Sequence, residues 1–508
     1  MPTLYRNGSV YSPADPGATA ILVDGDRVAW VGAEEAADGH VGPSVGLVDL
    51  DGALVTPAFV DSHVHVSETG LASDGADLTG SGSLQEALRR VSEHAHRSPG
   101  EVLLGFGWED ERWPEGRPPS RPELDEVAAG APVYLARRDV HSAVVSSALL
   151  AADPDIASAV GYSDGLLRRD AHHLARRAAL DLVPESRLRR LRKSVLSRAA
   201  EAGFGAVHEI GAPHISAADD LATVIALGQE PDLPDVVGYW GELGGVARAV
   251  ALGAAGAAGD LNIDGSLGSR TARLASPYAD APNTRGHLYL DLDVATDHVV
   301  ACTEAGIQAG FHCIGDEAVR TAVAALAAAA DRCGRSAVIA ARHRLEHVEA
   351  LDLDLIPELA RLGVVASVQP VFDELWGGAG GTYAARLGVE RAGGLNPFAA
   401  MARAGVILAF GSDSPVTPIG GWEMVRAAVY HHNPAHRVSV RSAFAAATRG
   451  GWQAARVDDA GVLAPGMLAS FAVWDAPAGA EGLPDLTPGT RLPVCLRTVI
   501  DGNPAFTR

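Results

Sequence analysis

The sequence predicts an α/β protein: a (β/α)8 TIM-like barrel, a small composite β-sandwich domain from both termini, and an insertion after the first barrel strand. Three observations support this fold class. Apolar strand-like runs alternate with helical patterns, glycine separates the two in each cycle, and short strands with polar turns occupy both ends of the chain.

The central part of the chain repeats one cycle. A helical segment ends near a glycine, an apolar run follows, and a polar residue closes the run; examples are 205–210, 306–312, 363–369 and 405–413. This order indicates parallel strands joined by crossover helices. The number of cycles fits a closed barrel, expected over residues 57–456, better than an open sheet.

The two chain ends have the same strand-and-turn character. Residues 18–32 form two β-runs around an Asp-Gly-Asp turn, and 469–475 and 494–502 are short strands. Neither end could bury a core alone. Residues 1–56 and 457–508 are therefore expected to pair into one small β-sandwich domain.

The segment from about 66 to 179 interrupts the barrel rhythm. Its stretch 108–120 is rich in proline and aromatic residues. We interpret the segment as an insertion of loops and short strands over the barrel mouth, where it would shape a substrate pocket.

Composition excludes several classes of protein. The formal net charge of −22 argues against nucleic-acid binding and against anionic membranes, both of which need clustered Lys and Arg. The four cysteines show no Cys-x-x-Cys pairing, so neither a disulfide framework nor a thiolate zinc site is expected.

No signal peptide and no apolar run of about 18 residues is visible. The expected protein is cytoplasmic and acts on a small molecule; whether it forms a homo-oligomer stays open.

Two histidines end the first apolar run of the barrel. His63 and His65 follow the run that begins at Val55. Side chains two apart on a strand share a face, so both imidazoles can reach one point in space. Neutral imidazole is a common zinc ligand, and barrels of this kind place their chemistry at the C-terminal ends of strands.

Three further polar residues stand at or near the ends of later apolar runs: His312, His347 and Asp413. With His63 and His65 they form the expected ligand set for a divalent metal, which lowers the pKa of bound water from 15.7 to about 7. Asp413 is the candidate that accepts the proton of the attacking water and passes it to a leaving nitrogen. His347 is the second catalytic candidate, because it could help to stabilise the oxyanion.

These motifs resemble the amidohydrolase superfamily, and within it the YtcJ-like branch that includes N-substituted formamide deformylase. The resemblance spans nearly the whole chain and is carried by 57–65 (PAFVDSHVH), 264–272 (DGSLGSRTA), 312–318 (HCIGDEA), 344–347 (RLEH), 367–370 (SVQP), 411–415 (GSDSP) and 461–471 (GVLAPGMLASF). It implies a metal-dependent hydrolase of carbon–nitrogen bonds other than peptide bonds.

The sequence departs from its relatives at one position. Many of them carry a lysine shortly before the Asp-Gly-Ser motif, whose carbamate bridges two metals. The corresponding run, 258–266, contains no lysine, and Lys193 is the only lysine of the chain. A single ion, expected to be zinc, is therefore favoured over two. The alternative is a bridging carboxylate, for which Glu209 and Asp260 are the candidates.

Five residues are candidates for substrate contact. His141 matches a histidine in the insertion of the relatives, and polar residues at strand ends line the pocket of such barrels; the set is His141, Asp264, Ser266, Arg270 and Gln369. The alternative for each is a structural role in tying loops together. Arg270, for example, could simply neutralise Asp264.

Two other functions stay open. The same fold and metal would also serve a deaminase or a ring-opening hydrolase of a heterocycle. A non-catalytic metal-binding relative is the third possibility, although the ligand set is complete apart from the bridging lysine.

Overall fold

A computed structural model describes the chain except for residues 111–112, 139–141 and 480. The chain forms two compact units. The first contains Met1–Val66 and Leu196–Arg508, and the second contains Ser67–Val195.

The first unit is built on a parallel sheet of eight strands, which confirms the predicted barrel. The strands follow one another in the sheet in the order in which they occur in the chain. They are β7 (Phe59–Val64), β14 (Phe204–Gly211), β15 (Asp235–Trp240), β16 (Gly256–Ala257), β17 (Gln308–Cys313), β18 (Arg344–His347), β19 (Val365–Val368) and β20 (Ile407–Phe410).

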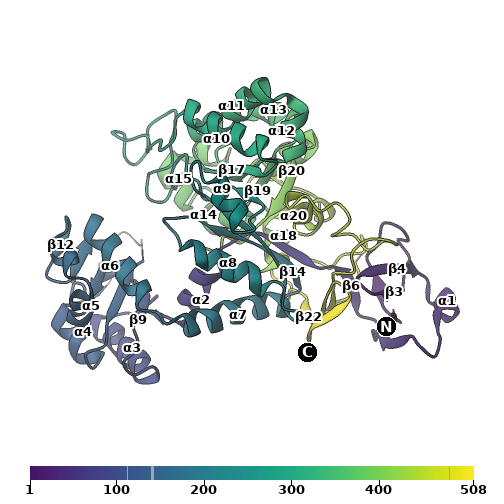
Figure 1. The fold of residues 1–508 in the computed structure, drawn as a ribbon, viewed down its shortest axis with the longest axis horizontal. Helices are drawn as coiled ribbons and strands as arrows, with labels where there is room; N and C mark the ends of the chain where they lie inside the picture. Colours follow the sequence, from purple (N-terminus) through teal and green to yellow (C-terminus); the bar gives the residue numbers. More distant parts are fainter. Residues whose placement is uncertain (111–112, 139–141, 480) are drawn as a thin grey trace. The chain divides into compact units, whose positions relative to one another are not determined.

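Helices connect these strands and surround the sheet (Figure 1). Helix α7 (Glu185–Glu201) leads into β14. The others are α8 (Ala218–Leu227), α9 (Val246–Ala251), α10 (Leu292–Glu304), α11 (Asp316–Cys333), α12 (Arg335–Ala341), α13 (Ile356–Arg361), α14 (Pro370–Trp376), α15 (Thr382–Leu387), α16 (Val389–Ala392), α17 (Phe398–Ala404), α18 (Gly421–Val429), α19 (Val440–Ala446) and α20 (Arg449–Ala454).

The barrel strands are buried on both faces. Every residue of β7, β14 and β17 is buried. A parallel sheet covered by helices outside and filled by side chains inside needs such continuous apolar runs, which is why the hydrophobic pattern located these strands.

The first and last strands complete the circle through their backbones. Val64 and Ser414 form a parallel bridge. The N–H of Asp413 donates to the carbonyl of His63 at 2.7 Å, and the N–H of His65 donates to the carbonyl of Ser414 at 2.9 Å. The barrel therefore closes at the positions of three predicted site residues.

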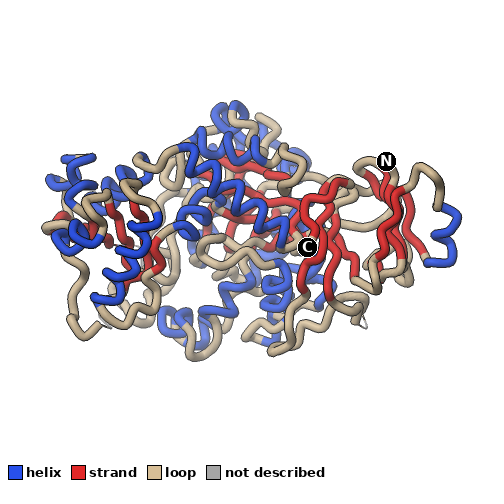
Figure 2. Tube along the Cα trace, turned by 90° about the horizontal axis from the view of Figure 1, so that it is seen from below, coloured by secondary structure: helices blue, strands red, loops and turns tan. Residues whose placement is uncertain are grey.

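Both chain ends contribute to two small sheets of the first unit (Figure 2). The four-stranded sheet has the order β4 (Arg27–Gly32), β3 (Ala20–Asp24), β1 (Thr3–Arg6) and β5 (Gly46–Asp49), with α1 (Glu34–Ala37) beside it. The five-stranded sheet has the order β2 (Ser9–Val10), β6 (Leu54–Pro57), β21 (Phe471–Asp475), β22 (Val494–Ile500) and β23 (Asn503–Thr507).

One apolar core joins these two sheets. It includes Tyr5 and Ile21 from the first sheet and Val55, Phe471 and Val499 from the second. The composite β-sandwich and the hairpin within 18–32 are thus present. The exact domain boundaries at 56 and 457 stay predictions.

The second unit is more regular than the loops and short strands expected there. It contains a six-stranded sheet of order β12 (Tyr162–Ser163), β13 (Leu166–Arg168), β11 (Ser142–Val145), β10 (Val133–Arg137), β9 (Leu103–Trp108) and β8 (Ala76–Asp77). Its helices are α2 (Val66–Asp74), α3 (Leu84–Arg97), α4 (Arg121–Val127), α5 (Ser147–Ala152) and α6 (Arg169–Asp181). Two clusters of buried apolar residues give this unit a core of its own.

Among the residues that the structure describes, no helix combines the length and apolar character needed to cross a membrane.

The start of β15 holds a carboxyl group that destabilises the fold at neutral pH. Burial, with a smaller effect of Asp501, raises the pKa of Asp235 to about 7. An aspartate in an unfolded chain has a pKa near 3.9, so the folded state disfavours the charged form. The resulting penalty grows as pH rises from about 4 towards 7 and persists above it.

We therefore predict that Asp235→Asn raises the free energy of unfolding by about 1–3 kcal/mol at pH 8 and by much less at pH 4.5. Urea unfolding at both pH values, with a chelator present, measures the change. Asp24→Asn changes an exposed residue at the end of β3 and is the matched control. We expect it to leave the free energy of unfolding unchanged at both pH values. An equal gain in the free energy of unfolding at both pH values would contradict the raised pKa of Asp235.

Candidate metal centre

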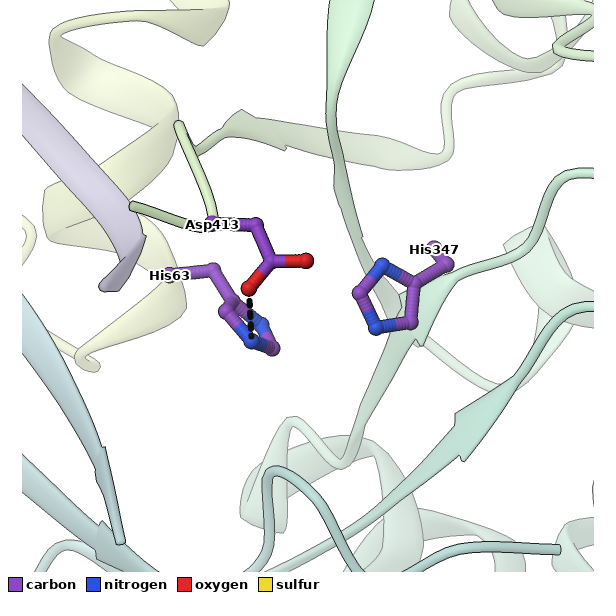
Figure 3. Close-up of side chains that lie close together, drawn as sticks. All are labelled: His63, His347 and Asp413. Carbon is purple, nitrogen blue, oxygen red and sulfur yellow. Dashed lines mark ion pairs between the residues drawn. The ribbon is translucent and has the colours of Figure 1, made fainter. Parts of the chain in front are cut away.

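The predicted metal-binding residues converge at the C-terminal ends of the barrel strands. His63 and His65 come from the end of β7, His312 from β17, His347 from the end of β18, and Asp413 follows β20. Asp413 Oδ1 lies 3.5 Å from His63 Nε2 and 3.1 Å from His65 Nε2. The ring of His347 lies 5.0 Å from that of His63 and 4.5 Å from that of His312. Figure 3 shows His63, His347 and Asp413 facing one another.

Two groups of side chains among the described residues could each hold a metal ion. One is His63, His347 and Asp413, and the other is His63, His65 and Asp260. Within each group the ligand atoms all lie within 4.8 Å of one another. Because His63 is common to both groups, they form one continuous cluster.

Asp260 is the bridging candidate that lies in this cluster. Its carboxylate oxygens are 3.6 Å from His63 Nε2, 3.5 Å from His65 Nε2 and 3.9 Å from His347 Nε2. Gly259, just before it, has a φ of 88°, a left-handed conformation that favours glycine. Asn262, just after it, forms a parallel bridge with His312. The turn and the bridge fix the segment that carries Asp260 beside β17.

The other bridging candidate has a backbone contact at the exit of β7. Glu209 Oε2 accepts a hydrogen bond from the N–H of Val66 at 2.8 Å. Glu209 is in neither of the two metal-binding groups found among the described residues. Its position therefore fits a role in holding the backbone next to His65.

Neighbouring acceptors orient three of the imidazoles. Nδ1 of His65 donates to the carbonyl of Ile210 at 2.8 Å, and Nδ1 of His347 donates to Gln369 Oε1 at 2.8 Å. Nδ1 of His63 is 2.9 Å from Glu346 Oε2. Since each acceptor takes the proton on Nδ1, each ring presents the Nε2 lone pair to the cluster.

The buried charges in the cluster attract one another. Burial alone would lower the pKa values of His63 and His65, but Asp260 and Asp413 raise that of His63 well above its usual range and that of His65 to about 9. Conversely, burial would raise the pKa values of both aspartates, yet the histidines lower them. The two carboxylates thus need positive charge beside them.

The donor set fits a divalent cation. His63 Nε2, Asp260 Oδ1 and His312 Nδ1 are buried atoms without a hydrogen-bond partner. Such atoms are costly unless something binds them. Imidazole nitrogen and carboxylate oxygen are ordinary zinc ligands, and a metal ion would replace the protons that the aspartates otherwise attract.

The backbone is strained at the same place. His347, Val348 and Asp413 have φ values of 70°, 50° and 54°. Non-glycine residues seldom adopt this left-handed conformation, and a β-branched residue such as Val348 is a genuine outlier. Each such residue costs about 1–3 kcal/mol, and such residues cluster at functional sites.

The residues proposed for substrate contact have other partners in the structure. Asp264 accepts hydrogen bonds from the N–H groups of Arg273, Ile314 and Gly315. Arg270 pairs with Asp280 rather than with Asp264. These contacts fit the structural alternative, while substrate contact by Asp264 and Arg270 stays a prediction.

Ser266 and Gln369 are also engaged. The hydroxyl of Ser266 is 2.8 Å from that of Ser269. Gln369 orients His347, while its buried Nε2 lacks a partner. The contact proposed for His141 falls outside the described residues. Substrate contact by these residues stays a prediction.

Glu346, whose Oε2 lies 2.9 Å from His63 Nδ1, is not among the residues predicted from the sequence. A signal was present: Arg344 and Glu346 are two apart in a short strand, so their opposite charges point to the same side and can pair. The pair stands directly before His347, one of the predicted metal ligands.

Comparison with known proteins identifies the family. A family model described as "Amidohydrolase family" matches residues 46–506. YtcJ of Bacillus subtilis (strain 168) is 26% identical over 452 residues, which cover 82% of this chain and 82% of YtcJ. Protein LONG AFTER FAR-RED 3 of Arabidopsis thaliana is 29% identical over 540 residues, covering 93% of this chain and 88% of that protein.

One further relative and one solved structure are also similar to this chain. N-substituted formamide deformylase of Arthrobacter pascens is 35% identical over 136 residues, covering 26% of this chain and 25% of the enzyme. The crystal structure of an uncharacterized metal-dependent hydrolase from Pyrococcus furiosus matches with a TM-score of 0.77 and 26% identity. It covers 93% of this chain and 98% of the other.

Proposed function

Because this chain belongs to the amidohydrolase family and is a metal-dependent hydrolase of that superfamily, we propose that it cleaves a carbon–nitrogen bond other than a peptide bond in a small molecule. The observation that carries the proposal is the cluster of four histidines and two aspartates at the C-terminal ends of the barrel strands. The similarity to N-substituted formamide deformylase supports an amide-like bond as the target.

The residues divide the chemistry between them. A divalent metal held by the cluster would lower the pKa of water to about 7 and polarise a carbonyl oxygen. Asp413 accepts the proton of the attacking water and then delivers it to the departing nitrogen. His347, fixed by Gln369, can stabilise the negative charge that develops on the carbonyl oxygen.

The donor set supports zinc. Nitrogen and oxygen donors at this density suit Zn²⁺ better than Mg²⁺ or Ca²⁺, which prefer all-oxygen sites. The sequence argues against the carbamate bridge of many relatives, because the run 258–266 has no lysine and Lys193 is the only lysine of the chain.

The number of donors supports two ions. One tetrahedral zinc uses four ligands, whereas six side chains meet in this cluster. Asp260 Oδ1 lies 3.6 Å from His63 Nε2 and 3.9 Å from His347 Nε2, whereas its Oδ2 lies 3.5 Å from His65 Nε2. We therefore propose that the cluster would hold two ions, with Asp260 as the ligand that they would share. The sequence favoured a single ion because the bridging lysine of many relatives is missing.

A substrate panel tests the bond class. N-substituted formamides and related amides should release their acid and amine when the protein is supplied with zinc. Heterocycles with exocyclic amino groups serve as the comparison. Release of ammonia or ring opening of these heterocycles, without amide cleavage, would instead favour the deaminase or ring-opening alternative.

Asp413→Asn should lower kcat by at least about 10³-fold, because the amide can neither take up nor deliver the proton. The fold should survive, since the backbone bonds of residue 413 that close the barrel do not involve the side chain. Circular dichroism and thermal melting check the fold. An active Asp413→Asn variant would rule out the proposed proton transfer.

Metal analysis tests the bridging role of Asp260. We expect two zinc ions per wild-type chain and one in Asp260→Ala, measured after dialysis by elemental analysis. Glu209→Ala, which changes the other bridging candidate, should retain two. One ion in the wild type would restore the single-metal interpretation.

A further inference from the structure

A fully buried guanidinium lies inside the barrel, three residues before His347 on the same strand. Arg344 and Glu346 both belong to β18, and their side chains are 0% exposed. Nε of Arg344 donates to Glu346 Oε1 at 2.5 Å, and Nη2 donates to Glu346 Oε2 at 3.0 Å. The guanidinium thus holds both carboxylate oxygens in a two-bond fork.

The remaining N–H groups of Arg344 reach other strands of the barrel. Nη2 donates to the carbonyl of Ser62 at 2.7 Å and to Ser367 Oγ at 3.0 Å. Nη1 donates to His208 Nδ1 at 3.1 Å, and the guanidinium carbon lies 4.2 Å from the ring centroid of Tyr239. The side chain therefore contacts β7, β14, β15 and β19 in addition to its own strand.

Glu346 connects this guanidinium to the metal centre. Its Oε2 accepts the Nδ1 proton of His63 at 2.9 Å while it also receives an N–H of Arg344. A carboxylate can only accept in both bonds, so the proton of His63 must reside on Nδ1. The Nε2 lone pair of His63 then faces Asp260 and Asp413.

We propose that Arg344 is a positioning residue of the metal centre: by clamping Glu346, it fixes the tautomer and the ring orientation of His63. This inference rests on the metal binding proposed above, and goes beyond it by assigning part of the zinc affinity to a residue that does not touch the metal. Partners of metal-bound histidines typically contribute 10- to 100-fold to metal affinity.

The geometry requires arginine rather than a generic positive charge. Lysine could neutralise Glu346 but could not bond both of its oxygens and Ser62 in one plane. Arg344→Lys should therefore weaken zinc binding although the net charge of the barrel interior is unchanged.

The single substitution Glu346→Gln tests the contact between Glu346 and His63 most directly. The amide oxygen would turn to Arg344, which needs acceptors, and the amide NH₂ would then face His63 Nδ1. That contact favours the other tautomer of His63, with the proton on Nε2, the atom needed for the metal. We expect the zinc affinity, measured by competition with a chromophoric chelator, to fall 10- to 100-fold.

A double variant separates positioning from folding. Arg344→Met combined with Glu346→Leu replaces the ion pair by apolar groups of similar size, which often preserves stability in a buried site. We expect the metal-free double variant to stay folded by circular dichroism but with a lower urea midpoint, because the carbonyl of Ser62 and His208 Nδ1 lose a donor, together with the same loss of zinc affinity.

A matched ion pair provides the control. Arg342, two residues earlier, makes a two-bond contact with Asp458 at 2.8 and 2.7 Å but lies outside the barrel interior. Arg342→Met should leave the zinc affinity within about twofold of wild type.

The outcomes distinguish this inference from the proposed function. Zinc affinity equal to that of wild type in both Glu346→Gln and the double variant would overturn the positioning role and leave the hydrolase proposal intact. A wild-type protein that binds no zinc would overturn both.

Discussion

The closure of the barrel between β7 and β20 is the contact on which the metal centre depends. The backbone bond from Asp413 to the carbonyl of His63 pairs the first strand with the last. Asp61 reinforces it, because its Oδ1 accepts N–H groups of both Ser412 and His63 at 2.8 and 3.2 Å. Without this closure, the histidines at the start of the barrel sequence and the aspartate at its end would have no reason to meet.

Hydrophobic pattern and strand-end polarity were enough to predict much of this arrangement. The runs that became β7, β14, β17, β19 and β20 are continuous and buried, so a simple search for apolar segments finds them. The convergence of His63, His312 and Asp413 follows from parallel strands, since their carboxyl ends meet at one edge.

The rest depended on geometry that spacing does not encode. Strand β16 has only two residues, so the direction of Asp260 is set by a turn at Gly259 and by pairing with β17 rather than by a recognisable pattern. The choice between Asp260 and Glu209 therefore could not be made from the sequence. The same holds for Asp264, because the spacing of the motif does not reveal that its oxygens accept the backbone N–H groups of Ile314 and Gly315.

The short link between β6 and β7 has a consequence for how the chain folds during its synthesis. Only Ala58 separates the two strands, and β6 pairs with β21 near the other end of the sequence. Trp474 and Thr56, which share a hydrogen bond across this pairing, are 418 residues apart. On the ribosome, β6 emerges early, and its edge that pairs with β21 has no partner at that stage. It must stay unaggregated until almost the whole chain has been synthesised, and such long-range pairing makes folding slow.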